Sequence, residues 1–327
     1  MNFEPKNLLV IHFGQLGDVV LGLPAMKAIR ERFPDAQRTA IVGAATAEIV
    51  RMVDLFDEVI PVDRVRLLKG NKFSSSVEII NFARSIRRMR FDLVIDLHSL
   101  PETNLLGYFS GAKRRLFSRR ESRSLDFLAN FRPVPPDEDK SIHLSEYYMN
   151  VLTPLEMSES PAPFRFDRSL SKIPDHPIVG LNPGAGNPSR RWPVESFIEL
   201  TRTILDSGQA EVEVLIGPED RQLVAGFNDA LKGRCSVNTG SSLEDLVSSL
   251  SRLSLLVSND TGPAHVAAVT GIPIILLRHS ASPDRYLPLA EHLVVHRGEE
   301  LADISCAEVF SSVVKMLGMA EEPAGSR

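Results

Sequence analysis

The sequence has few of the residues that define several common protein classes. Its 327 residues include two cysteines, Cys235 and Cys306, which lie far apart and outside any CxxC pattern. This spacing argues against a disulfide framework or a cysteine metal site and indicates reduced thiols in the cytoplasm. Histidine is also sparse, with eight residues in the chain, and the sequence predicts no metal site.

Long apolar runs are missing as well. The first, Leu8–Phe13, is too short for the hydrophobic region of a signal peptide and has neither a basic cluster nor a small-residue cleavage site beside it. The stretch 262–277 is shorter than a membrane span and contains His265 and Pro273. We therefore expect a cytoplasmic protein with neither a secretion signal nor a transmembrane helix.

Length and charge indicate two domains of different character. A chain with 43% hydrophobic and 24% charged residues fits two globular domains, each with its own core. Residues 1–132 contain 21 Lys/Arg and 15 Asp/Glu, whereas the remainder contains 16 and 27, so the net charge of −5 is unevenly spread. Either the halves merely differ in their solvated surfaces, or the N-terminal half binds an anionic partner such as a phosphorylated acceptor or a membrane surface.

Short apolar segments alternate with amphipathic ones along the chain. The apolar segments predict strands at residues 8–13, 39–42, 58–62, 93–97, 178–182, 212–216, 255–258 and 274–277. Helical spacing predicts helices at 24–33 (with Pro24 in the first turn), 77–89, from about 143, 194–205, 220–231, 243–250 (after a capping box of Ser241 and Glu244) and 263–269. This alternation indicates parallel sheets covered on both faces by helices.

Two irregular segments interrupt the alternation. Residues 132–140 form a polar, proline-rich stretch that predicts a loop, and residues 156–176 contain the expected domain boundary. We expect an α/β protein with two doubly wound, Rossmann-like domains, 1–160 and 161–327. Ligands of such domains bind at the carboxyl ends of the strands, so two of them would face a shared cleft.

Phe13–Asp18 is the first of three loops that could carry chemistry, because it directly follows a strand. Its two glycines permit a sharp turn and a close approach to a ligand, and Asp18 lies at the start of a helix. By spacing alone, the better interpretation of Asp18 is a helix N-cap that satisfies orphan amides.

The second loop, Leu181–Pro193, joins a strand to a helix in the second half. Its glycines and paired arginines could bind an anion through amides and guanidinium groups, although it matches neither a Walker A loop nor GxGxxG. The alternative is an ordinary connecting loop with Trp192 packed on the domain surface.

The third loop, Val257–His265, brings Asp260, Thr261 and the amides after Gly262 to a predicted helix N-terminus. Free N–H groups and the helix dipole favour a phosphate there. An Asp-Thr-Gly triplet also occurs in aspartic proteases, but those need a β fold and a second copy, and neither is present in this sequence.

Two other charged segments carry less weight. Asp137 and Asp139 have the DxD spacing of metal-dependent sugar transferases, but they lie in a proline-rich loop rather than at a strand end, so we assign them no metal. Residues 113–123 contain six basic residues in eleven. Without interleaved aromatic residues, and in an acidic protein, this run indicates a solvated edge rather than nucleic-acid binding.

Taken together, these segments resemble glycosyltransferase family 9, which includes the lipopolysaccharide heptosyltransferases. The similar segments are 9–24, 92–98, 183–192, 217–219 and 258–265, so the resemblance extends over nearly the whole chain. It implies a GT-B fold and an inverting transfer of heptose from ADP-heptose to an anionic, lipid-linked acceptor of the lipopolysaccharide core, with no metal and no cofactor. It also implies peripheral contact with the cytoplasmic face of the inner membrane.

The resemblance assigns a role to individual residues. Asp18 would be the general base, and Arg190, where the family often has lysine, would stabilise the leaving diphosphate. The implied donor-binding residues are Gly184, Gly186, Arg190, Glu219, Asp260, Thr261, Gly262 and His265, and the implied acceptor-binding residues are Gly17, His98 and Arg120. Two positions depart from the family: His12 stands for a usual Lys or Arg, and His98 for a usual Gln.

Two other functions remain open at this stage. A nucleotide-sugar epimerase on the same fold would need a second acid/base pair, which the sequence does not reveal. A non-catalytic nucleotide-sugar-binding protein is less consistent with the joint presence of Asp18, Arg190 and Asp260. An NAD-dependent enzyme is disfavoured because the first strand–helix turn lacks GxGxxG.

Overall fold

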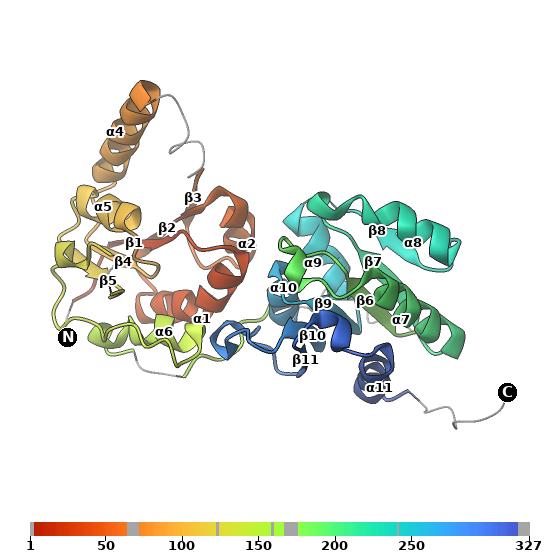
Figure 1. Cartoon of the computed structure of the whole chain (residues 1–327). Helices are drawn as coiled ribbons and strands as arrows, with labels where there is room; N and C mark the ends of the chain where they lie inside the picture. Colours follow the sequence, from red (N-terminus) through yellow and green to blue (C-terminus); the bar gives the residue numbers. More distant parts are fainter. Residues whose placement is uncertain are drawn as a thin grey trace. The chain divides into compact units, whose positions relative to one another are not determined.

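The computed structural model describes residues 3–63, 72–121, 124–157, 160–166, 176–240 and 242–319. The chain divides into two compact units (Figure 1). Unit 1 comprises residues 1–162 together with 284–287, and unit 2 comprises residues 163–283 and 288–327. The sequence did not indicate that the short segment 284–287 belongs with the N-terminal half.

Unit 1 contains a five-stranded parallel sheet with the order β3-β2-β1-β4-β5. Its strands are β1 (Asn7–His12), β2 (Gln37–Gly43), β3 (Glu58–Val62), β4 (Leu93–Asp96) and β5 (Arg114–Phe117). Apolar residues fill both faces of the central strand β1, as expected for a parallel sheet covered on both sides. The carboxyl ends of β1 and β4 lie side by side, with Ile11 paired with Asp96.

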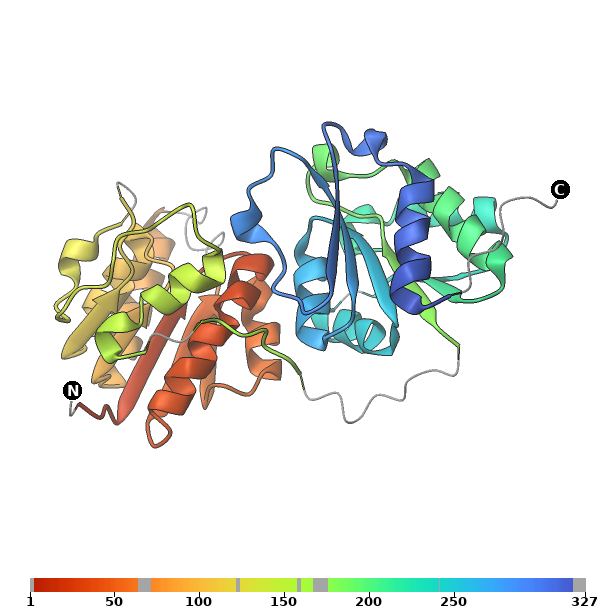
Figure 2. The same ribbon diagram turned by 90° about the horizontal axis from the view of Figure 1, so that it is seen from below.

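Helices cover both faces of this sheet (Figures 1 and 2). The helices of unit 1 are α1 (Leu16–Arg32), α2 (Ala47–Met52), α4 (Lys72–Arg88), α5 (Pro101–Phe109) and α6 (Leu144–Asn150). Helices α1 and α6 pack together on one face, and α4 and α5 on the other. Because side chains alternate along β1, Ile11 joins the core under α4 and α5, whereas His12 contacts Tyr148 of α6.

Unit 2 contains a six-stranded parallel sheet with the order β11-β10-β9-β6-β7-β8. Its elements are β6 (Ile178–Asn182), α7 (Val194–Ser207), β7 (Glu211–Leu215), α8 (Leu223–Leu231), β8 (Ser236–Asn238), α9 (Leu243–Arg252), β9 (Leu255–Asn259), α10 (Gly262–Thr270), β10 (Ile274–His279), β11 (Leu293–Gly298) and α11 (Cys306–Leu317). The prediction of two α/β domains with parallel sheets is confirmed. Among the described residues, none of the helices has both the length and the apolar character needed to cross a bilayer.

All eight predicted strands are present, but the helix after β1 was predicted wrongly. It begins at Leu16 rather than Pro24, so Pro24 lies in its interior, where it cannot donate a hydrogen bond to the preceding turn. Residues 19–26 are buried all round, which removes the amphipathic pattern on which the prediction depended. The predicted capping box also lies one residue further on, between Ser242 and Asp245; Ser241 itself is outside the described residues.

Candidate functional site

Asp18 lies in the first turn of α1, directly after β1. The interpretation of Asp18 as a cap is correct in kind but wrong in position. Gln15 is the N-cap, and Asp18 lies three residues further on as its capping-box partner, where its Oδ2 accepts the Gln15 N–H at 3.2 Å. A Cβ on Gly14 would lie 2.6 Å from both the Cβ of Asp18 and the Cε1 of His12. Gly14 therefore lets the aspartate pack beside the histidine ring, which is a different role from contact with a ligand.

The surroundings of Asp18 make its carboxyl a stronger base than usual. Burial raises the pKa of Asp18, and this effect exceeds the opposing influence of the Gln15 amide and of the Arg120 and Arg285 guanidinium groups. Gly17, an implied acceptor contact, is partly exposed in the same turn. The end of β1 thus presents a carboxylate whose proton affinity is set by burial and by two cations.

His12 is fully buried and cannot replace the basic residue of the family in contacting an acceptor. Its Nδ1 accepts the Gly14 N–H at 3.2 Å, which places the proton of the neutral ring on Nε2. Burial lowers the pKa of His12 far below its usual value, and His98 and Arg120 lower it further. His12 is therefore a neutral packing residue whose ring stacks on His98 with centroids 5.1 Å apart.

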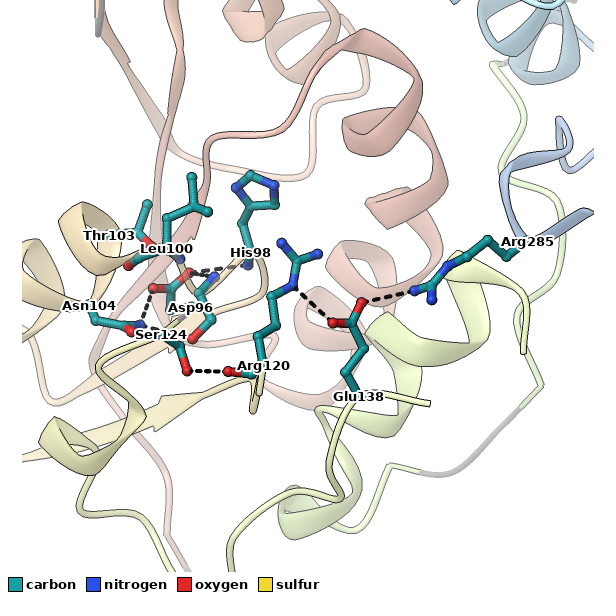
Figure 3. Close-up of polar contacts among 10 residues, drawn as sticks. Asp96, His98, Leu100, Thr103, Asn104, Arg120, Ser124, Glu138 and Arg285 are labelled. Atoms are coloured by element: carbon teal, nitrogen blue, oxygen red, sulfur yellow. Dashed lines mark hydrogen bonds and ion pairs between the residues drawn. The ribbon is translucent and has the colours of Figure 1, made fainter. Parts of the chain in front are cut away.

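Asp96 organises the turn that presents His98 (Figure 3). Its Oδ1 accepts the N–H groups of His98 and Ser99 at 3.1 and 2.8 Å, and its Oδ2 accepts Nδ2 of Asn104 at 2.8 Å. Burial raises the pKa of Asp96 to about 6, against the opposing effect of these hydrogen bonds. Because these bonds of the carboxyl hold the local chain, Asp96 positions the turn.

Arg120 belongs to a chain of ion pairs that joins distant parts of the sequence (Figure 3). Glu138 lies between two arginines: its Oε2 is 3.9 Å from Nε of Arg120, and its Oε1 is 3.1 Å from a terminal nitrogen of Arg285. The terminal nitrogens of Arg120 lie on the side away from Glu138, towards His98 (Figure 3). Both arginines lower the pKa of Asp18, so two cations lie close to its carboxylate.

Sequence reasoning missed Glu138 and Arg285. They are 147 residues apart, and the interaction exists only because segment 284–287 packs in unit 1. His143 contributes to this packing, since its Nε2 lies 3.0 Å from the carbonyl oxygen of Leu287. No local motif marks either residue, so the sequence carried no signal that could have paired them.

The residues with DxD spacing are engaged by neighbours in the structure. Asp137 pairs with Arg119 at 3.1 Å, and Asp139 accepts the backbone N–H and the hydroxyl of Ser141. His292 and His296 are four residues apart in sequence. His296 lies in β11 and His292 directly precedes it, and in an extended strand that spacing spans about 13 Å. Within the described ranges, no group of three or more His, Cys, Asp or Glu side chains could hold a metal ion.

The two neighbouring arginines of the β6–α7 loop have different environments. Arg191 donates twice to the carbonyl oxygen of Ala185, at 2.8 and 2.6 Å, and pairs with Asp220 at 2.9 Å, so it holds the loop. Arg190 is exposed and close enough to lower the pKa of Asp260. Arg190, not Arg191, is the arginine available to a ligand.

The two glycines of this loop also differ. A Cβ on Gly184 would lie 2.3 Å from Oδ2 of Asp220, so this glycine is required by packing inside the loop. A Cβ on Gly186 would meet nothing within 4 Å, so Gly186 is open to solvent or to a ligand. Glu219 is exposed at the end of β7, next to the buried Asp220.

Trp192 is buried, so the alternative that placed it on the domain surface is wrong. It has no exposed area, its Nε1 donates to the carbonyl oxygen of Ile304 at 2.9 Å, and its ring lies edge-on to Phe197. Its backbone N–H donates to Oδ1 of Asn259, while Nδ2 of Asn259 donates to the carbonyl oxygen of Pro183. Asn259 therefore fixes the β6–α7 loop against the end of β9.

Asp260 and the start of α10 complete the unit 2 site. Burial raises the pKa of Asp260, opposed first by Arg278, whose guanidinium lies 3.3 Å from the carboxylate. The start of α10 offers an anion fewer amide donors than the sequence suggested. Pro263 has no N–H, and the Ala264 N–H donates to the Thr261 carbonyl. The amides of Thr261 and Gly262 remain as its first donors, with His265 buried one turn behind them.

The candidate residues thus form two sets, one in each unit, and each set lies at the carboxyl ends of the strands of that unit's sheet. In unit 1, Gly17 and Asp18 follow β1, His98 follows β4 and Arg120 follows β5. In unit 2, the residues that follow the adjacent strands β6, β7 and β9 are Gly184, Gly186, Arg190, Glu219, Asp260, Thr261, Gly262 and His265. Both sets lie at the carboxyl ends of parallel strands, where such sheets bind ligands.

Known proteins are similar to this chain in sequence. Residues 79–313 match the profile of glycosyltransferase family 9 (heptosyltransferase). The chain is 25% identical over 313 residues to lipopolysaccharide heptosyltransferase 2 of Escherichia coli K12, a match that covers 89% of this chain and 87% of the relative. It is 22% identical over 297 residues to the lipopolysaccharide core heptosyltransferase OpsX of Haemophilus influenzae, covering 87% and 82%.

Solved structures agree on the fold. The glycosyl transferase family 9 protein of Veillonella parvula matches 98% of this chain and 99% of its own with a TM-score of 0.79 at 22% identity. E. coli heptosyltransferase WaaC, solved with ADP-2-deoxy-2-fluoro heptose, matches 94% of this chain and 99% of its own with a TM-score of 0.80 at 20% identity. The chain belongs to glycosyltransferase family 9 and is a glycosyltransferase with the two-domain GT-B fold.

Proposed function

We propose that the protein transfers heptose from ADP-heptose to an anionic, lipid-linked saccharide of the lipopolysaccharide core, with inversion at the sugar carbon and without a metal ion. Unit 1 holds the acceptor and unit 2 holds the donor. The names of the relatives support this choice, since they include lipopolysaccharide heptosyltransferases from Escherichia coli, Salmonella typhimurium and Haemophilus influenzae. The WaaC structure supports an ADP-sugar as donor because it contains ADP-2-deoxy-2-fluoro heptose.

The observation that carries the proposal is that Asp18 has a raised pKa and a carboxylate oxygen available to accept a proton. A general base must be free to accept a proton, and its proton affinity must be matched to its task. Within the described residues, Asp18 makes a single structural hydrogen bond through Oδ2, and burial raises its pKa. In the proposed reaction, this carboxylate removes the proton of the acceptor hydroxyl as that oxygen bonds to the sugar.

The proposed acceptor site is cationic as well as basic. Arg120 and Arg285 lie close enough to Asp18 to lower its pKa, and Glu138 fixes both guanidinium groups. Guanidinium groups bind carboxylates and phosphates through paired hydrogen bonds. We assign these two arginines to an anionic group of the acceptor and Glu138 to their positioning.

On the donor side, the proposal needs charge stabilisation for the leaving nucleotide. Arg190 and the amides of Thr261 and Gly262 supply positive potential at the end of the sheet that also carries Asp260. Fixed donors of this kind stabilise charge where it develops in the transition state. We propose that Arg190 replaces the charge that a metal ion supplies in other transferases.

Binding of nucleotide sugars tests the donor assignment. ADP-heptose should raise the Tm by several degrees, because a ligand at 100 times its Kd stabilises the folded state by about 2.7 kcal/mol. UDP- and GDP-sugars at the same concentration should leave the Tm nearly unchanged. A larger shift with a UDP-sugar would refute the donor, and conversion of the donor without any acceptor would indicate an epimerase.

Chelation tests the absence of a metal requirement. Transfer measured in excess EDTA should proceed at the rate seen without it, since Arg190 and the α10 amides provide the stabilising charge. The matched measurement adds Mg²⁺ or Mn²⁺ to the chelated enzyme. A strict dependence of the rate on either ion would contradict the metal-free mechanism.

A further inference from the structure

Arg278 is a buried charged residue near the end of an apolar strand. β10 begins with four buried apolar residues, 274–277, and Arg278 follows them with 1% of its surface exposed. A guanidinium group stays charged at any physiological pH, and burial of a charge is costly unless a group of opposite charge balances it. The position of Arg278 therefore indicates an acidic partner beside it.

That partner is Asp260, which directly follows the neighbouring strand β9. The N–H of Asp260 donates to the carbonyl oxygen of Leu277 at 3.1 Å, so the two chains are joined next to Arg278. A terminal nitrogen of Arg278 lies 3.3 Å from Oδ2 of Asp260 and donates to the carbonyl oxygen of Pro283 at 3.1 Å. Arg278 thus holds one carboxylate oxygen of Asp260 and is itself fixed by the loop that follows β10.

The other groups around Asp260 differ from Arg278 in their exposure. Burial raises the pKa of Asp260, and Arg278 is the first of the cations that oppose this effect, followed by Arg190 of the β6–α7 loop and Arg297 of β11. Arg190 and Arg297 are exposed. The titratable side chain of α10 is His265, which is buried. A ligand can reach the two exposed arginines, whereas Arg278 has too little exposed surface to contact one.

A carboxylate is an unfavourable neighbour for a bound anion. Asp260 directly precedes Thr261 and Gly262, whose amides are the first donors at the start of α10. An ionised Asp260 alone would repel a diphosphate bound there, because like charges a few ångströms apart interact strongly where water is partly excluded. Paired with Arg278, the carboxylate has little net effect on an anion. Its Oδ1, which accepts no hydrogen bond from the described residues, stays available to a ligand.

We propose that Arg278 is a positioning residue of the donor site: it neutralises Asp260 beside the donor's diphosphate and leaves Oδ1 of Asp260 to accept a hydrogen bond from a hydroxyl group of the donor sugar. Arg278 itself touches no atom of the donor. Only the identity of the donor rests on the proposed function; the pairing of Arg278 with Asp260 does not.

Calorimetric titration of the full chain with ADP, without acceptor, tests the neutralising role. Arg278→Gln leaves Asp260 with an uncompensated charge, so ADP affinity should fall about tenfold, the effect of losing one close charge interaction. Arg278→Lys keeps the charge and should bind ADP within about threefold of wild type. A tenfold loss in Arg278→Lys would overturn the proposal, and this variant decides the question even if Arg278→Gln does not fold.

Removal of both charges should restore ADP binding. In the double variant Arg278→Gln/Asp260→Asn no unpaired charge remains, so ADP should again bind within about threefold of wild type. An arginine that acted independently of Asp260 would instead give additive losses, and these would overturn the proposal. The extra affinity of ADP-heptose over ADP should stay reduced, because an amide oxygen accepts a hydrogen bond less strongly than a carboxylate. Full recovery of that extra affinity would refute the contact assigned to Oδ1.

The pH dependence of ADP binding separates charge from packing. Without Arg278, the pKa of Asp260 should rise further, because burial is then opposed by Arg190 and Arg297 alone. As the pH falls through that pKa, Asp260 becomes neutral, and the ADP affinity of Arg278→Gln should approach that of wild type. The ratio of the two affinities cancels the ionisation of ADP and of His265. A ratio that stays constant with pH would contradict the neutralising role.

Arg38→Gln is the matched control, because Arg38 is a buried arginine of unit 1 with the same kinds of contact. It pairs with Asp57 at 3.2 Å and donates to the carbonyl oxygen of Pro34 at 3.1 Å. This variant should lower the Tm and leave ADP affinity unchanged. If Arg278→Gln likewise lowers only the Tm, Arg278 is a structural residue and the proposal fails.

The choice of nucleotide separates this role from the proposed reaction. A wild type that binds UDP or GDP in place of ADP would refute the proposed donor, and the same variants titrated with that nucleotide would still decide the role of Arg278. Wild-type affinity for ADP and ADP-heptose in Arg278→Gln, together with normal transfer by the wild type, would overturn the role of Arg278 alone.

Discussion

Replacing Asp18 by Asn should reduce the rate of transfer by a factor of about 10²–10⁴ while leaving donor affinity nearly unchanged. Asn keeps the size of the side chain, and its Oδ1 can still accept the Gln15 N–H that Asp18 accepts at 3.2 Å. It cannot take a proton from the acceptor hydroxyl. Single-turnover transfer measures the loss, and calorimetric titration with ADP-heptose measures donor binding.

Asp245→Asn is the matched control for this variant. Asp245 occupies the same position in the first turn of α9 and accepts the N–H of the N-cap Ser242 at the same distance of 3.2 Å. Both substitutions should cost a few tenths of a kcal/mol to about 1 kcal/mol of stability through the weakened helix start. If Asp18→Asn lowers only the Tm, as Asp245→Asn should, the aspartate is a capping residue and the proposed mechanism fails.

The pH dependence of wild-type kcat/KM provides a second test of Asp18. Asp18 must be ionised to act as a base, so the rate should fall as the pH drops through its pKa. Because burial raises that pKa, the acid limb of kcat/KM should lie above the ordinary aspartate value of about 3.9. Glu138→Gln leaves both guanidinium groups without their fixed partner, so it should move this limb, whereas Asp245→Asn should not.

Replacing Arg190 by Ala should reduce kcat/KM by a factor of about 10² and weaken donor binding at the same time. The side chain is exposed and makes no structural ion pair among the described residues, so the Tm should stay at the wild-type value. Arg190→Lys keeps the charge without the planar fork and should recover part of the rate. Steady-state kinetics with varied donor concentration measures both effects.

Arg191→Ala is the contrasting variant, because Arg191 holds Ala185 and Asp220. Removing it leaves the buried carboxylate of Asp220 without its cation, which should lower the Tm clearly. The two neighbours therefore separate ligand binding from loop stability. A wild-type rate in Arg190→Ala, or a loss of stability as large as that of Arg191→Ala, would rule out the assigned role of Arg190.

The fold could be predicted from sequence wherever burial is continuous. Strands such as β1 and β9 contain unbroken apolar runs, and each was predicted within one or two residues. The strands that were missed are edge or short strands: β5 begins with two arginines, β8 has three residues, and β11 is partly exposed along most of its length. The start of α1 was missed because a helix buried on all sides has no periodic pattern.

The residues of the candidate site also differ in whether a sequence pattern can reveal them. Asp18 lies in the first turn of α1, Asp260 directly follows β9, and Arg190 lies in the loop between β6 and α7. These are positions that a sequence pattern can mark. Arg285 and Glu138 cannot be found in this way, because their contact depends on the packing of a segment nearly half the chain away. The distinction between Arg190 and Arg191 likewise depends on where Asp220 lies.

The grouping of residues 284–287 with unit 1 has a consequence for hybrid enzymes. A chimera made by a single cut near residue 162 would take everything after the cut, including segment 284–287, from one parent. Glu138 and His143, which contact that segment, would come from the other parent. The proposed acceptor site would then be assembled from unmatched parts even if both halves folded. Exchange of sugar specificity by domain shuffling should succeed more often when this four-residue segment is grafted back from the acceptor parent.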